Sequence, residues 1–323
     1  MRDVLGAWGL AEASVEARAD GSPHRHWTVR AAPGYLLRSY DERRTDEAVR
    51  YEHELLGYLA ERSWPVAAPV VAADGSTVVQ ADGARWALFP LMPGETPPQD
   101  EEIYLQRRGA LLALLHEDLD DAWPAERARD TFGRLDDLDT VARANGCDSF
   151  AAVVEHVRLV DDTRAETLAG LRERSAEALH LAGYARFPVT VIWGACTASH
   201  VLFQGDDVTA LLDFDEARPD TRAVDIAAAL RADAGGDGWR VHRWIAGYCA
   251  HATPPFHVIE ANLVPVAMTA VALREATAAL AAASAGGGPD AEAMARIDAA
   301  VEAEADEPEL RRVIRTAAGH PSA

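Results

Sequence analysis

Hydrophobic and polar residues alternate in short runs over the first ninety positions, which is the pattern of a small antiparallel sheet. Strand-like runs at 27–30 and 35–40 are separated by the turn dipeptide Pro33-Gly34. Between 45 and 64 the apolar residues recur at helical spacing, with acidic residues in the first turn. Further strand-like runs, with Asp-Gly turns between them, follow at 66–71, 77–80 and 85–91. The pattern predicts a β-rich region crossed by one helix.

Beyond residue 93 the pattern is mainly helical. The ranges with helical spacing are 105–119, 149–182, 223–283 and an acidic tail after residue 289. The most apolar stretch, 263–283, is interrupted by Pro265, Arg274 and Glu275. It therefore predicts a buried helix and not a membrane span.

The order of these elements predicts two lobes. Prolines and glycines between 90 and 98 interrupt the sheet pattern and mark the connection between the lobes. Strand-like alternation returns after residue 189, with a turn at Gly205-Asp206. We expect an α+β fold with a β-rich lobe at 1–92 and a helical lobe at 93–323, which contains a hairpin at 193–215.

Composition narrows the classes of partner. The 323 residues are 49% hydrophobic and 26% charged, as in an ordinary globular protein. The net charge of −21 repels phosphates, which argues against nucleic acid and anionic membranes as partners. It would suit a cationic substrate, although acidic surfaces commonly serve solubility alone. Three widely spaced cysteines and the absence of a signal-peptide pattern predict a cytoplasmic protein without a disulfide framework.

All 31 basic residues are arginine, because the sequence contains no lysine. A mechanism that needs a lysine ammonium, such as a P-loop, a Schiff base or the strand lysine of kinases, is therefore excluded or must use arginine.

Two segments carry the candidate chemistry. The first begins Trp193-Gly194-Ala195 and reaches His200, and the second reads Leu211-Leu212-Asp213-Phe214-Asp215. Their pattern resembles the aminoglycoside phosphotransferase and choline kinase family, in which His-Gly-Asp, four residues and Asn precede a hairpin that ends in Asp-Phe or Asp-Trp. The resemblance implies a two-lobed, protein-kinase-like fold. It also implies that one Asp deprotonates the acceptor hydroxyl, while Asn and a second Asp hold Mg²⁺ on ATP.

The resemblance extends over most of the chain and implies further contacts. Arg38 stands where relatives use Lys or Arg on the nucleotide, and Glu52 stands where they have the glutamate partner of that residue. Phe89 and Leu91 lie in a segment similar to the hinge whose backbone pairs with adenine. The segment 244–248 resembles a late helix of homoserine kinase type II.

Three departures from the family pattern concern its catalytic residues. Trp193 replaces the His, Ala195 replaces the catalytic Asp and His200 replaces the Asn, whereas Asp213 is retained. A methyl group cannot accept a proton, and general-base catalysis is typically worth about 10²–10⁴ in rate. The sequence therefore predicts that this fold has lost most of its usual activity.

Several roles stay open at this point. Asp213 fits either a metal or nucleotide contact or a solvated acid at the end of a strand. Asp215 points the same way if the strand continues, and would then add a second carboxylate or a substitute base. His200 fits a metal ligand, although imidazole prefers softer ions than Mg²⁺, or a merely packed or surface histidine. Arg38 and Glu52 fit a nucleotide contact or a plain ion pair.

Three other features favour structural interpretations. The segment 20–24 lies where a phosphate-covering loop would be, but Pro23 lacks a backbone donor, so a turn is the better interpretation. No base lies at a suitable spacing from Cys196, so we expect this cysteine to be a small buried hydrophobic residue and not a nucleophile. We expect Asp225 to have a structural role, as a capping or hydrogen-bonding residue near the start of its helix.

These observations lead to one hypothesis and two alternatives. The leading hypothesis is a degenerate phosphotransferase, a pseudokinase-type ligand-binding or partner protein or a repurposed catalyst. The first alternative is an active ATP-dependent phosphotransferase acting on a hydroxyl or amino group of a small metabolite or peptide, with Asp213 and His200 on Mg²⁺ and Asp215 assisting. The second is an accessory protein of secondary metabolism that recognises a peptide. Each implies a small-molecule or peptide ligand between the lobes, and the first also admits a protein partner.

Overall fold

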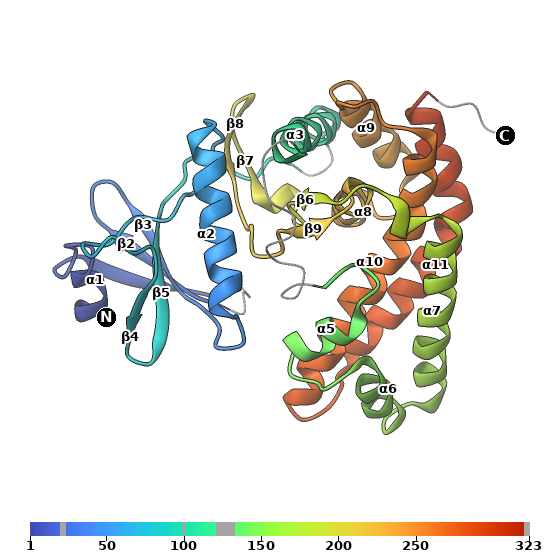
Figure 1. Ribbon diagram of the computed structural model, residues 1–323, viewed down its shortest axis with the longest axis horizontal. Coiled ribbons are helices and arrows are strands. Elements are labelled where there is room, and N and C mark those ends of the chain that lie inside the picture. The colour runs from blue at the N-terminus through green and yellow to red at the C-terminus, as the bar shows by residue number, and fades with distance from the viewer. Residues whose placement is uncertain (20–23, 99–100, 121–132, 320–323) are drawn as a thin grey trace. The chain divides into compact units, whose positions relative to one another are not determined.

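The computed structural model describes residues 1–19, 24–98, 101–120 and 133–319, and groups the chain into two compact units (Figure 1). The turn predicted at 20–23 lies outside the described residues. Unit 1 is Met1–Thr96 with Ser199–Asp215, and unit 2 is Pro97–Ala198 with Glu216–Ala323. Unit 1 is rich in strands and unit 2 is mainly helical, which confirms the predicted α+β class.

Unit 1 is built on a five-stranded antiparallel sheet with the strand order β1-β2-β3-β5-β4. The strands are β1 (Ser14–Arg18), β2 (Arg25–Arg30), β3 (Tyr35–Ser39), β4 (Val79–Ala81) and β5 (Ala84–Pro90). One face buries Val29, Leu37 and Leu88, and the short helix α1 (Arg2–Gly6) adds Val4 and Leu5 to this core. Packing of these alternate positions explains why the period-two pattern predicted most of the sheet.

The strand predicted at 66–71 is not formed. Val66 makes only an isolated parallel bridge to Leu211, and Val70 donates one hydrogen bond to the carbonyl of Leu88. Pro69 explains the difference, because proline has no N–H for a strand ladder.

One helix, α2 (Asp46–Glu61), accompanies the sheet, as predicted. Thr45 caps it, since its side-chain oxygen accepts a hydrogen bond from the backbone N–H of Ala48. Its buried face contains Val49, Leu55 and other apolar residues, and also Glu52. A carboxylate on the buried face of a helix needs a partner, and this partner comes from β3.

The hairpin of β7 (Val201–Gln204) and β8 (Asp207–Leu211) belongs to unit 1. The sequence analysis had assigned all of 193–215 to the helical lobe. In the structure β7 pairs with Glu95, and β8 is bridged to Val66, so backbone hydrogen bonds join 199–215 to unit 1. The boundaries of the compact units therefore differ from the predicted division at residue 92.

Unit 2 contains the helices α3 (Glu102–Asp120), α5 (Leu138–Ala144), α6 (Phe150–Arg158), α7 (Asp162–Leu181), α8 (Arg222–Asp233), α9 (Gly238–Cys249), α10 (Val258–Ala285) and α11 (Ala291–Ala317). Two short strands, β6 (Thr190–Ile192) and β9 (Arg218–Asp220), pair antiparallel among them. Among the described helices, α10 alone is long and apolar enough to cross a membrane by length and composition, and 78% of its most apolar window is buried inside the protein. The burial agrees with the core helix predicted there.

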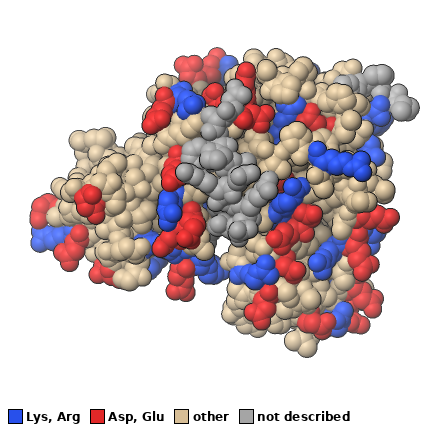
Figure 2. Space-filling view, in the orientation of Figure 1, with Lys and Arg blue, Asp and Glu red and all other residues tan. Residues whose placement is uncertain are grey.

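Charged side chains are interspersed on the face shown in Figure 2, where Asp and Glu lie among Arg over both units. Several pairs join neighbouring helices of unit 2, such as Arg174 on α7 with Glu304 on α11. The net charge of −21 therefore includes many locally paired charges.

Helices α3 and α9 approach each other until their backbones touch. A Cβ atom on Gly109 would lie 2.2 Å from the carbonyl oxygen of Trp244, and one on Gly247 would lie 2.1 Å from that of Gln106. Glycine is required at both positions, because any side chain would collide with a main chain that is held in a helix.

We predict that Gly247→Ala destabilises the protein by about 1–3 kcal/mol, because overpacking forces the two helices apart. Gly57→Ala, in the interior of α2, is the matched control, since a Cβ atom there meets nothing within 4 Å. It should instead stabilise by about 0.5–1 kcal/mol. Thermal unfolding of the two variants measures both, and equal melting temperatures would contradict the close approach of α3 and α9.

Candidate functional site

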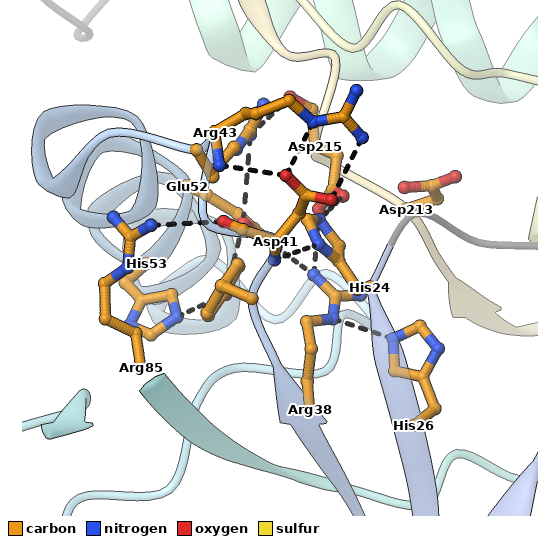
Figure 3. A network of polar contacts seen from close by, with 12 residues as sticks. His24, His26, Arg38, Asp41, Arg43, Glu52, His53, Arg85, Asp213 and Asp215 are labelled. Atoms are coloured by element: carbon orange, nitrogen blue, oxygen red, sulfur yellow. Dashed lines mark hydrogen bonds and ion pairs between the residues drawn. The ribbon is translucent and has the colours of Figure 1, made fainter. Parts of the chain in front are cut away.

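An arginine on the central strand β3 organises the polar residues of unit 1 (Figure 3). One nitrogen of Arg38, Nη1, donates to Glu52 Oε1 and to Asp215 Oδ1, both at 2.8 Å. Its Nε donates to His26 Nε2 at 3.1 Å. The sequence analysis expected the pair of Arg38 and Glu52, and the structure adds Asp215 as a second carboxylate. We call His24, His26, Arg38, Glu52 and Asp215 the Arg38 cluster.

Contacts from several sides fix Asp215. The backbone N–H of Asp41 donates to His24 Nδ1 at 3.0 Å, so the ring proton of neutral His24 sits on Nε2. That nitrogen donates to Asp215 Oδ2 at 2.6 Å. Arg44 donates to the backbone carbonyl of Asp215 at 2.5 Å. Both carboxylate oxygens of Asp215 are thus engaged inside unit 1.

The two carboxylates that share Arg38 differ in acidity. Burial alone would raise the pKa of Asp215, but the charge of Arg38, the hydrogen bond from His24 and the charge of Arg44 hold it well below its usual value. Burial raises the pKa of Glu52 to about 8, and the charge of Asp215 adds to this effect. Asp215 is therefore the ionised partner of Arg38 near neutral pH, and Glu52 holds a proton up to about pH 8.

Tyr40 and His53 extend the cluster. The hydroxyl of Tyr40 lies 2.8 Å from His53 Nε2 and 3.2 Å from Glu52 Oε2, and His53 Nδ1 lies 2.8 Å from the hydroxyl of Thr77. Burial, followed by the charge of Arg38, lowers the pKa of His53 to about 4. His53 is therefore neutral near pH 7.

His200 and Asp213 form a separate pair. His200 Nε2 lies 3.4 Å from Asp213 Oδ2, and their side chains are 28% and 40% exposed. The hairpin explains the pairing, because Val201 lies opposite Leu211 and the N–H of Leu212 donates to the carbonyl of His200. Two residues distant in sequence thereby meet at the open end of one hairpin.

The strand does not continue to Asp215, so the condition under which Asp213 and Asp215 would point the same way is not met. Strand β8 ends at Leu211, and Asp213 adopts a φ of 61°, in the left-handed region. This turn sends Asp213 toward His200 and Asp215 toward Arg38, as Figure 3 shows for the two acids. Asp215 is a poor base because its pKa is low and both oxygens accept hydrogen bonds.

The pair of His200 and Asp213 offers a metal ion one imidazole nitrogen and one carboxylate. Within the described part of the chain, no group of three or more His, Cys, Asp or Glu side chains is arranged to hold a metal. Two protein ligands suffice where phosphates supply the rest, as for Mg²⁺ in kinases. The carboxylate fits Mg²⁺, whereas the imidazole suits ions such as Mn²⁺ or Zn²⁺ better.

The segment with Ala195 follows β6 in unit 2, and a buried acid of α8 holds its backbone. Asp225 accepts hydrogen bonds from the N–H of Trp193 at 2.8 Å and of Gly194 at 2.7 Å. His116 lies 3.0 Å from the same carboxylate. Asp225 thus has a structural role, as predicted, and it fulfils this role by binding the backbone of the loop. Its backbone is fixed, while Ala195, a residue that is 8% exposed, has only a methyl side chain.

The next residues of the loop are equally well anchored. The N–H of Ala198 donates to Asp233, which also pairs with the buried Arg108 of α3. Burial, together with the charges of Asp233 and Asp225, raises the pKa of Cys196 well above its usual value. Cys196 is therefore a buried thiol without nucleophilic character, as predicted.

The two hinge residues have different surroundings. Phe89 is buried in β5, opposite Leu36, and the guanidinium of Arg38 lies 5.1 Å from the centre of its ring. Leu91 is 47% exposed, and its backbone N–H already donates to the carbonyl of Gly34. That amide is therefore engaged within the sheet, so an adenine ring would need another hinge group. Adenine contact by this segment stays a prediction.

Sequence reasoning missed the histidines of the Arg38 cluster. His24 and His26 are two residues apart, and His26 lies opposite Arg38 in the sheet register. The signal that could have revealed them is their spacing of two residues at the start of β2, since side chains at this spacing lie on the same face of a strand. His53 lies next to Glu52 on α2 and gave no signal of its own.

We predict opposite contributions of Glu52 and His53 to the pH dependence of stability. Glu52 has a pKa of about 8 in the folded chain against 4.5 as its reference value, so its protonation favours folding and this stabilisation is lost as pH rises toward 8. His53, with a pKa of about 4 against 6.5, makes stability rise from pH 4 to 6.5. Of these two residues, only Glu52 changes the pH dependence between pH 6.5 and 8. In this range the free energy of unfolding should fall by up to about 1.4 kcal/mol per pH unit.

Glu52→Gln should abolish this fall, because the amide mimics the protonated acid and does not titrate. Urea unfolding at half-unit steps from pH 6 to 8.5 measures the effect. The exposed Glu61 of the same helix provides the control variant Glu61→Gln, which should follow the parent chain. Parallel profiles for the parent and Glu52→Gln would show that Glu52 is ionised throughout.

Comparison with known proteins agrees with this architecture. The phosphotransferase enzyme family (APH) matches residues 14–261. An uncharacterized protein of Synechocystis sp., sll1119, is 30% identical over 242 residues, and the match spans 72% of this chain but only 63% of that protein. The homoserine kinase of Caulobacter sp. (strain K31) is 26% identical over 278 residues, which cover 84% of this chain and 82% of that enzyme.

A solved structure shares the fold. Amicoumacin kinase hAmiN, in complex with AMP-PNP, Ca²⁺ and Ami, has a TM-score of 0.66 at 13% identity, with 92% of this chain and 87% of that chain covered. A kinase of this fold thus binds a nucleotide analogue, a divalent ion and a small molecule. The predicted kinase-like fold and the resemblance to aminoglycoside phosphotransferases are confirmed, and the chain belongs to the phosphotransferase enzyme family.

Proposed function

We propose that this chain is a degenerate phosphotransferase, which binds a small molecule or peptide with its kinase-like fold and transfers phosphate slowly or not at all. The observation that carries this proposal is the loop at Ala195. Asp225 holds the loop backbone through two hydrogen bonds of 2.7 and 2.8 Å, so the frame that would orient a base is intact. The position of the base itself carries a methyl group.

Neither Asp215 nor Cys196 is a suitable substitute for the base. Asp215 is held by Arg38 and His24 and has a lowered pKa, so it has little tendency to accept a proton. Cys196 is buried with a raised pKa. Loss of a general base typically costs about 10²–10⁴ in rate, which would leave ligand binding as the main activity.

Nucleotide binding is part of the proposal, with ATP and a divalent ion as the ligands. Asp213 and His200 would contact the ion, and Arg38 would contact the phosphates, as the family pattern implies. Arg38 already binds Asp215, so a phosphate would have to compete with an internal carboxylate. We therefore expect weak nucleotide binding in a cytoplasmic protein that does not bind nucleic acid or membranes.

An active kinase is the second candidate, and the pair of His200 and Asp213 favours it. Both side chains are partly exposed and lie 3.4 Å apart, as two ligands of one ion would. The relatives that are homoserine kinases suggest the hydroxyl group of a small amino-bearing metabolite as acceptor. In this case Ala195 would reduce the rate without abolishing the reaction, since phosphoryl transfer depends mainly on positioning and charge.

We predict that Ala195→Asp combined with His200→Asn raises ATP-dependent phosphorylation of homoserine by about 10²-fold or more over the parent chain. The rate is measured with purified protein and Mg²⁺. The same double substitution with Asp213→Ala added is the control and should be inactive.

Two outcomes would contradict the proposal that this chain is a degenerate phosphotransferase. The parent chain could turn over rapidly and lose this activity in Asp213→Ala, which would establish the active kinase. Alternatively, the double variant could stay inactive while it folds and binds nucleotide in a thermal-shift titration. That result would mean that the loop is adapted to another reaction.

A further inference from the structure

A buried arginine lies against the loop that contains Ala195. Arg218 is in β9, opposite Ile192 of β6, and its side chain is 4% exposed. Gly194 leaves room for it, because a Cβ atom at Gly194 would lie 3.0 Å from Arg218 Nη1. Gly194 also has a φ of 81°, so both the backbone and the contact favour glycine. The guanidinium is therefore next to the residue that precedes Ala195.

Most of the hydrogen-bonding capacity of Arg218 is unused. Nη1 donates to the backbone carbonyl of Glu216 at 3.0 Å. Nε is buried and, among the described residues, has no hydrogen-bond partner, and Nη2 has none there either. A buried donor without a partner is costly, typically by about 1–3 kcal/mol and by more for a charged group. The unsatisfied edge, Nε and Nη2, is one of the paired donor edges with which guanidinium groups bind carboxylates in a bidentate manner.

A second arginine adds positive charge at this position. Burial, followed by the charge of Arg218, lowers the pKa of Arg274 on α10 to about 10, so Arg274 is still charged at neutral pH. Arg274 Nη1 donates to the carbonyl of Arg134 at 3.3 Å. Two like charges in a poorly solvated position repel each other, and the charges of Glu216 and Asp220 offset this repulsion in part at Arg274.

The nearby acids do not use the free edge of Arg218. Asp220, on the same face of β9, accepts hydrogen bonds from the hydroxyl of Tyr184 and the N–H groups of Leu135 and Thr221. Glu216 is 58% exposed, and its carboxylate approaches only Nη1, at 3.7 Å. Within the described part of the chain, therefore, no carboxylate engages the Nε and Nη2 groups of Arg218.

We propose that the Nε and Nη2 edge of Arg218, supported by the charge of Arg274, binds a carboxylate group of the acceptor ligand beside Ala195. The inference rests on the proposed function, in which the chain binds a small molecule, and it specifies the class of that ligand. The ligand is a small hydroxylated or amino-bearing carboxylic acid. A purely cationic ligand, which the net charge of −21 alone would favour, does not match this position.

The test compares two ligands that differ only by a carboxylate. Homoserine and 3-aminopropan-1-ol carry the same hydroxyl and amino groups, and calorimetry measures their affinities for the full chain. We expect homoserine to bind at least tenfold more tightly, since hydrogen bonds to charged groups are worth about 1.5–3 kcal/mol. Arg218→Gln should remove this preference, and Arg218→Lys should retain only part of it, because lysine keeps the charge without the paired donors.

A second measurement does not depend on the identity of the ligand. Formate, compared with chloride at equal ionic strength, should raise the melting temperature of the parent chain and leave that of Arg218→Gln unchanged. Arg164→Gln is the control, since this arginine pairs with Asp298 at the surface of α7 and should respond like the parent. Inorganic phosphate should stabilise less than formate, because its tetrahedral oxygens fit a single planar edge less well.

Three results would overturn the inference. The first is that homoserine and 3-aminopropan-1-ol bind with equal affinity and formate does not change the melting temperature. The second is that Arg218→Gln still prefers homoserine. The third is that phosphate raises the melting temperature more than formate does. Nucleotide binding is titrated in parallel. If nucleotide binds but carboxylates have no effect that depends on Arg218, the carboxylate site fails while the proposed function stands.

Discussion

One guanidinium group shared between two acidic side chains joins three parts of the β-rich unit. Arg38 on the central strand contacts Glu52 on α2 and Asp215 at the end of the hairpin segment, each at 2.8 Å. Three pieces of chain that are distant in sequence therefore meet at one positive charge. A buried charge without its partner is strongly destabilising, so the helix, the strand and the hairpin segment depend on one another. An arginine can make these contacts and a further one to His26, because its donors point in several directions.

The same interaction bears on the proposed function, because Arg38 already contacts two acidic side chains of its own chain. A cation that is already neutralised inside the fold is less available to a phosphate. The loop with Ala195 shows the complementary change, since its backbone is held by Asp225 while the reactive group is missing. These two observations are the basis of our proposal that ligand binding is the main activity.

Much of the fold was predictable from sequence, because local patterns determine it. Period-two alternation located the strands around Leu37 and Leu88, and Thr45 marked the start of α2. The strand expected at 66–71 is not formed, because Pro69 has no N–H for a strand ladder although the run is apolar. The hairpin of β7 and β8 lies in the same compact unit as the five-stranded sheet. Its pairing with Glu95 is a tertiary contact that no local pattern encodes.

The candidate site was predictable in part, and the limits have physical causes. The pair of Arg38 and Glu52 followed from the family pattern, and so did the meeting of Asp213 with position 200. The opposite directions of Asp213 and Asp215 depend on one left-handed residue, which sequence does not reveal when the residue is not glycine. Arg218 gave no signal because its importance lies in an unused donor edge, and this becomes visible only when all its contacts are known.

The contact between α3 and α9 limits how the length of the chain can change. Gly109 and Gly247 must each face the backbone of the other helix, and successive residues of a helix are about 100° apart around its axis. A single residue inserted near the start of α3 would turn Gly109 away from Trp244 or bring a larger side chain into its place. Changes of length close to Gly109 or Gly247 are therefore restricted by the facing backbone, whereas surface loops have no such restriction.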